Sequence, residues 1–160
     1  MSPQGGECAP AGFLTARRYA LVGASRGGRK FGNTLLRELR SRGLAVTPVH
    51  PHAGELEGLP CASSLAALTE PVEALVLCVP PAQVPGLLRE ALAAGIPRVW
   101  LQQGSESPEA AALGRELGLE LVAGQCLLLH LEPVRGLHAL HRWFWRRLGQ
   151  GRTARCDPPA

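Results

Sequence analysis

Three cations follow a short apolar segment near the N-terminus of this chain. Arg26, Arg29 and Lys30 lie within five residues, in a glycine-rich stretch between Tyr19-Ala-Leu-Val22 and a segment with helical periodicity. Glycines allow a tight turn of the backbone, and the unpaired N–H groups at the start of a helix favour an anion. This combination predicts a binding site for a phosphate-bearing ligand.

The stretch is a variant of the GxGxxG motif that binds dinucleotides. Gly23 ends the apolar segment and Gly28 falls at the third glycine of the motif, but Ser25 replaces the second. A serine there limits how closely the backbone approaches a pyrophosphate, and it offers a hydroxyl to a phosphate oxygen. Gly32 and Asn33 open the helix that follows.

The second predicted strand, residues 45–49, argues against a site for NAD. An NAD site needs Asp or Glu at the end of this strand, about 20 residues after the glycines, to hold the ribose hydroxyls. Here His50-Pro51 follows the strand, and the nearest acid, Glu55, lies beyond it. A ligand with a phosphorylated ribose avoids that carboxylate. NADP and coenzyme A therefore remain as candidate ligands.

Alternating strands and helices must position these residues. Leu35, Leu36 and Leu39 form the apolar face of a helix that ends at Gly43. Residues 74–79 are continuously apolar, which is typical of a parallel strand buried on both faces. The other predicted elements are strands at 99–101 and 120–122, helices at 81–94 and from Ser107-Pro108 onward, and a short strand near Pro60-Cys61 with a helical turn over 64–68.

This order predicts an α/β fold with a Rossmann-like, doubly wound, mostly parallel five-stranded sheet and helices on both faces. We expect one domain over residues 17–148, a flexible N-terminal segment at 1–16 and a disordered tail at 149–160. Residues 133–148 predict a last helix, with an apolar stripe that packs on the core or forms a face for a homo-oligomer.

Composition excludes several classes of function. No apolar run reaches the roughly 18 residues that a membrane span needs, and a net charge of +4 is too small to argue for nucleic acid. Five widely spaced cysteines predict neither a disulfide framework nor a zinc site, so we expect a reducing cytoplasm. The pairs His50/His52 and His138/His141 have no third ligand placed with them, so no metal site is predicted.

In sheets of this kind, ligands bind beyond the carboxyl ends of the strands. Four segments of the chain are predicted at those ends: 23–32, 50–51, 79–83 and 102–105. Although they are distant in sequence, the sheet should bring them to one rim.

Six short motifs on and near this rim carry a resemblance to a known family. They are Gly-Ala-Ser at 23–25, Lys-Phe-Gly at 30–32, Val-His-Pro at 49–51, Val-Pro-Pro at 79–81, Trp-Leu-Gln-Gln-Gly at 100–104 and Gly-Gln-Cys at 124–126. Because these motifs occur in this order and at this spacing, the chain resembles the small stand-alone CoA-binding proteins. These are similar to the CoA-binding domain of the succinyl-CoA synthetase α subunit and of ADP-forming acyl-CoA synthetases. The resemblance runs from about residue 19 to residue 148 and has one departure, because the family usually has Asn where this chain has His50.

The resemblance implies that coenzyme A is the ligand and assigns a part of it to each segment. Ser25 and Arg26, with the neighbouring backbone of Gly23, Ala24 and Gly32, would hold the pyrophosphate, and Lys30 would lie near a phosphate. His50 and Pro51 would flank the ribose or adenine. Val79, Pro80 and Pro81 would form an apolar wall, and Gln103 and Gly104 would lie beside the pantetheine arm.

The function implied is the binding of coenzyme A or an acyl-CoA without chemistry, as a carrier, sensor or regulatory module. The related synthetases use a phosphorylated histidine in a further domain and an ATP-grasp partner, for which 160 residues leave no room. No Ser-His-Asp or Cys-His set is visible at a plausible spacing. The alternative is an NADP-dependent oxidoreductase or another nucleotide-binding enzyme, which the missing acid permits.

Overall fold

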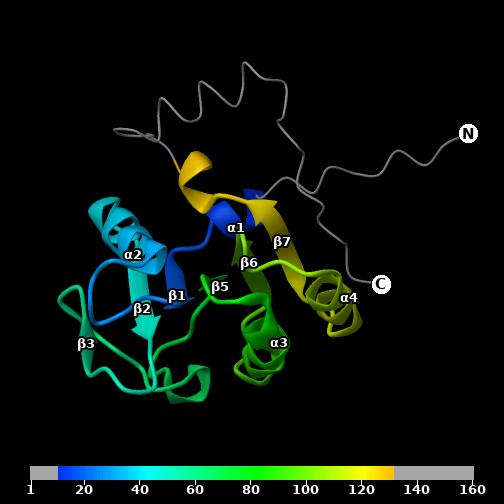
Figure 1. The fold of residues 1–160 in the computed structure, drawn as a ribbon, viewed down its shortest axis with the longest axis horizontal. Coiled ribbons are helices and arrows are strands. Elements are labelled where there is room, and N and C mark those ends of the chain that lie inside the picture. The colour runs from blue at the N-terminus through cyan, green and yellow to red at the C-terminus, as the bar shows by residue number, and fades with distance from the viewer. Residues whose placement is uncertain (1–10, 132–160) are drawn as a thin grey trace, which may run out of the picture.

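Five parallel strands form the centre of the molecule (Figure 1). The computed structural model describes residues 11–131 of the chain. The strands are β1 (Arg18–Val22), β2 (Ala45–Val49), β5 (Ala74–Leu77), β6 (Arg98–Gln102) and β7 (Glu120–Gln125). Their order is β2-β1-β5-β6-β7, and every neighbouring pair is parallel. The predicted doubly wound, five-stranded sheet is therefore confirmed.

Helices cover both faces of the sheet, as predicted. They are α1 (Ala11–Leu14), α2 (Phe31–Ser41), α3 (Val84–Ala93) and α4 (Pro108–Glu116), with short 3₁₀ turns η1 (Leu65–Ala67), η2 (Pro81–Gln83) and η3 (Leu127–Leu129). In Figure 1, α1 and α2 lie on one side of the sheet, and α3 and α4 lie on the other.

The alternation of side chains along each strand divides the core into two layers. Tyr19 and Leu21 pack in the layer under α1 and α2, whereas Ala20 packs in the layer under α3 and α4. All four residues of β5 are buried, two in each layer. A central parallel strand with a helix layer on each side has no polar face, which explains its continuously apolar sequence.

Local signals in the sequence set the ends of two helices correctly. After α2, Gly43 adopts a φ of +73°, and the N–H of Leu44 donates to the carbonyl of Leu39 at 3.2 Å. At the start of α4, the Ser107 hydroxyl accepts from the N–H of Ala110 at 3.1 Å. These are the glycine stop and the serine N-cap that the sequence predicts.

A small hairpin lies between β2 and β5. Its strands are β3 (Glu55–Leu56) and β4 (Leu59–Pro60), which pair antiparallel. The second of these confirms the short strand predicted near Pro60, but its partner β3 was not predicted. The turn consists of Glu57 and Gly58, both with positive φ, +52° and +75°. Two such residues in succession are typical of a tight two-residue hairpin turn.

Residues 11–16 of the N-terminal segment pack against the sheet. Phe13 is fully buried, with its ring centroid 5.1 Å from that of Trp100 and 5.5 Å from that of Tyr19. The Tyr19 hydroxyl donates to the Phe13 carbonyl at 3.0 Å. These residues are therefore docked on the core, since one aromatic side chain gains more by burial than the small residues around it suggest.

Three other expectations lie outside the described residues: those for residues 1–10, the helix at 133–148 and the tail at 149–160. Between residues 11 and 131, no helix has both the length and the apolar character needed to cross a membrane.

We expect Phe13→Ala to destabilise the fold by about 3–5 kcal/mol, because it empties a buried aromatic site. Phe31→Ala provides a matched control, since Phe31 is 39% exposed, and it should cost about 1 kcal/mol or less. Urea denaturation followed by far-UV circular dichroism measures both free energies of unfolding. Equal values for the two variants would contradict the docking of residues 11–16.

Candidate ligand site at the carboxyl edge of the sheet

The winding of the chain reverses between β1 and β5. From β1 the chain continues to β2 on one side, whereas β5, β6 and β7 extend on the other. The loops after β1 and β5 meet at this point, where Gly23 has a φ of +113° and a Cβ on it would lie 2.2 Å from the Cys78 carbonyl oxygen. Only glycine fits there. Ligands of doubly wound sheets bind in the crevice at such a reversal.

A second glycine lets α2 begin directly on the loop. A Cβ on Gly32 would lie 2.7 Å from the N of Ala24 and from the C and O of Gly23, all of them backbone atoms. A Cβ added to Gly28, in contrast, would meet only the Oε1 of Glu57, at 3.6 Å. The close helix–strand approach belongs to the third glycine of the dinucleotide motif. In this chain Gly32 provides it, and Gly28 instead provides a positive φ of +69°.

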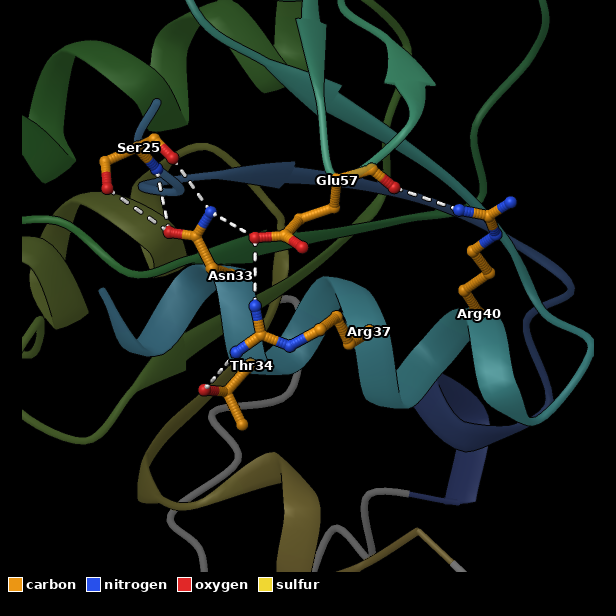
Figure 2. A network of polar contacts seen from close by, with 6 residues as sticks. All are labelled: Ser25, Asn33, Thr34, Arg37, Arg40 and Glu57. Atoms are coloured by element: carbon orange, nitrogen blue, oxygen red, sulfur yellow. Dashed lines mark hydrogen bonds and ion pairs between the residues drawn. The ribbon is translucent and has the colours of Figure 1, made fainter. Parts of the chain in front are cut away.

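Asn33 holds the loop from inside (Figure 2). This side chain is 1% exposed. Its Oδ1 accepts from the N–H of Ser25 at 2.9 Å and from the Ser25 hydroxyl at 3.3 Å, and its Nδ2 donates to the Ser25 carbonyl at 2.8 Å. Both backbone polar groups of Ser25 are thus satisfied within the protein. Sequence analysis placed Asn33 at the helix start but did not predict this contact.

Glu57 of the hairpin turn completes the network. Its Oε1 accepts from Asn33 Nδ2 and from Arg37 Nη1, both at 2.9 Å. The hydrogen bond from Asn33, assisted by the Arg37 guanidinium, lowers the pKa of Glu57 below its ordinary value. Glu57 is therefore ionised at neutral pH. No sequence signal connected it with the loop, because 24 residues separate it from Asn33.

The loop cations have no acidic partner. The side chains of Arg26, Arg29 and Lys30 are exposed and form no hydrogen bond or ion pair in the part of the chain that the structure describes. Other arginines are paired with carboxylates, in the pairs Arg18–Glu70, Arg37–Glu57, Arg42–Glu38 and Arg98–Glu120. Lys30 directly precedes α2 with an extended backbone. Unpaired cations beside a helix N-terminus suit an anion.

His50 lies in the field of the same cations. Burial, together with nearby Arg26, His52 and Lys30, lowers the pKa of His50 below its ordinary value. Its Nδ1 accepts from the N–H of His52 at 3.1 Å, and its own N–H donates to the Ala62 carbonyl at 3.0 Å. The loop after β1 and the end of β2 therefore converge as predicted. The exposed Pro51 follows directly on this edge.

The loops after β5 and β6 are tied to each other. The Ser105 hydroxyl accepts from the N–H of Val79 at 3.1 Å and donates to the Leu77 carbonyl at 3.2 Å. Val79 is buried beside this contact, whereas Pro80, Pro81 and Gln103 are exposed. The N–H of the exposed Gly104 donates to the Glu106 carboxylate at 2.7 Å. The predicted site residues thus share one edge of the sheet; their contacts with a ligand remain a prediction.

Burial raises the pKa of two of the described thiols, those of Cys61 and Cys78, above its ordinary value. Cys61, Cys78 and Cys126 are free. Burial, with a smaller effect of Cys126, raises the pKa of Cys78 to about 12, so its thiol stays protonated at neutral pH. Among residues 11–131, no three His, Cys, Asp or Glu side chains are grouped so that they could hold a metal ion.

The sheet order and the loop at its reversal point define an α/β domain of the Rossmann-like type. The sequence profile of the CoA binding domain matches residues 17–132, and the chain belongs to this family. The ADP-forming acetate–CoA ligase I of Archaeoglobus fulgidus is 28% identical over an alignment of 118 residues, and the match covers 68% of this chain and 17% of the ligase. The chain therefore spans about a sixth of that enzyme.

Solved structures agree with this assignment. A conserved hypothetical protein from Pyrococcus furiosus is 38% identical, with a TM-score of 0.69; the match covers 72% of this chain and 99% of that one. The dinucleotide-forming acetyl-coenzyme A synthetase 1 of Candidatus Korarchaeum cryptofilum, in complex with phosphate and ADP, is 26% identical with a TM-score of 0.64. That match covers 72% of this chain and 27% of the synthetase.

We expect Gly32→Ala to destabilise the protein by about 1–3 kcal/mol, because the new methyl group meets backbone that cannot move aside. The effect should appear although alanine favours a helix more than glycine does. Gly27→Ala is the control within the same loop, since a Cβ at Gly27 meets nothing within 4 Å. Chemical denaturation of both variants measures this. A Gly32→Ala protein as stable as wild type would contradict the close contact of α2 with the loop.

Proposed function

We propose that this chain binds coenzyme A, or an acyl-CoA, at the carboxyl edge of its sheet. The observation that carries the proposal is the set of three unpaired cations, Arg26, Arg29 and Lys30, beside the start of α2. Membership of the CoA binding domain family supports it. Coenzyme A carries a pyrophosphate and a phosphorylated ribose, so it offers several anionic groups to such a cluster.

The residues of the edge fit the parts of this ligand. Arg26, Lys30 and the first N–H groups of α2 would hold phosphates. The Ser25 hydroxyl would join them, because its 3.3 Å contact with Asn33 is long for an O–H···O hydrogen bond and is easily exchanged. Val79, Pro80 and Pro81 would supply the apolar wall, and His50 and Pro51 would flank the ribose or adenine.

The pantetheine arm would pass Gln103 and Gly104. The N–H of Gly104 already donates to a carboxylate, that of Glu106. This group is therefore able to hold an acceptor oxygen, and an amide oxygen of the arm would have to displace Glu106 from it.

We further propose that the chain binds this ligand without transforming it, as a carrier, sensor or regulatory module. Its protonated Cys78 is not a nucleophile at neutral pH. The chain corresponds to only 17% of the ADP-forming ligase that it resembles. Its free thiols agree with a cytoplasmic location.

Coenzyme A should raise the melting temperature of the protein. A ligand at a hundredfold excess over its dissociation constant stabilises the folded state by about 2.7 kcal/mol. Differential scanning fluorimetry with CoA, dephospho-CoA, NADP and NAD in parallel compares the ligand classes. We expect the largest shift with CoA. A shift with NADP and none with CoA would favour the oxidoreductase instead.

Two alanine variants show whether the shift comes from the proposed edge. Lys30→Ala should weaken CoA binding about tenfold, since it removes a charge-assisted hydrogen bond to a phosphate. Arg17→Ala is the control. It also removes one positive charge from an exposed side chain, but Arg17 directly precedes β1, at the end of the strand opposite to the ligand loop. This variant should bind CoA nearly as tightly as wild type. Isothermal titration calorimetry gives both constants.

CoA binding should strengthen as the pH falls from about 8 to about 6. Burial, together with neighbouring cations, holds the pKa of His50 below its ordinary value in the free protein. A bound phosphate offsets those cations and raises this pKa, so the complex takes up a proton that the free protein lacks. His50→Asn cannot titrate and should show a weaker pH dependence. The ionisation of the ligand's own phosphate affects both proteins alike, so parallel pH profiles would contradict a role for His50.

A further inference from the structure

The hairpin turn is connected to the ligand loop through a single chain of hydrogen bonds. Figure 2 shows Glu57 reaching from the turn to Asn33, whose amide holds both backbone polar groups of Ser25. Arg37, one turn further along α2, donates to the same carboxylate oxygen as Asn33. The Glu57 carboxylate thus contacts two residues of α2 but none of the loop cations.

The backbone of Glu57 adopts a conformation that glutamate disfavours. Its φ of +52° is the only positive value at a non-glycine position in the described residues. Glycine occupies such positions more readily because it has no Cβ to crowd the following carbonyl, and asparagine does so because its short polar side chain can hydrogen-bond locally. The Glu57 carbonyl accepts from Arg40 Nη1 at 2.9 Å, which anchors this strained backbone to α2. A glutamate at this turn is therefore explained by the contacts of its side chain rather than by its backbone preference.

A carboxylate is suited to hold Asn33 because it only accepts hydrogen bonds. It directs the Nδ2 of Asn33 toward Glu57, and the amide oxygen is then directed toward the N–H of Ser25. Without Glu57, the buried Nδ2 retains the Ser25 carbonyl alone. The amide would then have fewer constraints on its orientation, and Ser25 would be held less firmly.

From this geometry we propose that Glu57 is a positioning residue, which fixes the ligand loop through Asn33 and thereby favours the binding of a phosphate-bearing ligand. This inference rests on the proposed function. It predicts that removing the Glu57 carboxylate weakens the binding of an anion, whereas Coulomb repulsion alone predicts stronger binding. The Glu57 carboxylate lies near Gly28, so by Coulomb repulsion alone it would weaken the binding of an anion, and its removal would strengthen binding.

Glu57→Gly tests the proposal most directly, because it removes the carboxylate and also relieves the positive φ. A loss of affinity therefore cannot be ascribed to a destabilised turn. We expect the dissociation constant for CoA to rise about tenfold in calorimetry, with an unfolding midpoint no lower than that of wild type. Glu57→Gln should bind within about threefold of wild type, because its amide oxygen still accepts from Asn33. Glu57→Gly binding CoA as tightly as wild type, or more tightly, would overturn the proposal.

Two further measurements separate this role from others. In an Asn33→Ala background, Glu57→Gly should have no additional effect on affinity, since the proposed connection is already broken. Arg40→Ala is the control for the hairpin, because it removes a turn contact and leaves the carboxylate–amide contact in place. It should bind CoA nearly as wild type does. Additive losses in the double variant would contradict action through Asn33.

Amide hydrogen exchange of the free protein tests the loop without any ligand. The N–H of Ser25 should exchange faster in Glu57→Gly than in wild type or Glu57→Gln. If wild type fails to bind CoA, the proposed function is wrong, while this exchange still reports on whether Glu57 fixes the loop. Unchanged protection of Ser25 in Glu57→Gly would overturn the positioning role even if the affinity falls.

Discussion

The first turn of α2 lies on the backbone that leaves β1, with no side chain between them. Gly32 permits this contact, because a Cβ would lie 2.7 Å from atoms of Gly23 and Ala24. Gly23 in turn lies against the Cys78 carbonyl, which joins β1 to β5 at the reversal of the sheet. Two contacts of backbone on backbone therefore fix where the helix N-terminus, with its partial positive charge, meets the edge of the sheet. The positions of Lys30 and Arg26 depend on both.

The loop satisfies its own backbone internally, which changes how it can meet an anion. In the usual dinucleotide motif, backbone N–H groups near the second glycine approach the pyrophosphate. Here the N–H of Ser25 donates to Asn33, so that group is already occupied. Cationic side chains and the helix N-terminus are left to face the ligand. A loop of this kind favours a ligand rich in phosphate charge, since long side chains reach several phosphates whereas a single tight turn holds one.

Charge is distributed unevenly over the described residues. Away from the site, Arg18, Arg42 and Arg98 each pair with a glutamate, whereas the cations of the loop have no such partner. Positive charge is therefore concentrated here without compensation from the described residues, and it adds to the effect of burial that lowers the pKa of the nearby His50. An anion that binds at this edge would supply that compensation.

The sequence by itself determined the order of the five strands of the main sheet and of the helices between them. The apolar residues 74–77, the glycine stop at Gly43 and the Ser107 cap are local signals, and local signals survive folding because neighbours in sequence produce them. Only the tertiary structure decided the roles of Phe13, Asn33 and Glu57. Phe13 is buried by Trp100, 87 positions later in the chain, and Glu57 meets Asn33 from a hairpin 24 residues away. Such contacts have no periodicity or spacing to mark them, since they arise only when the sheet brings distant segments together.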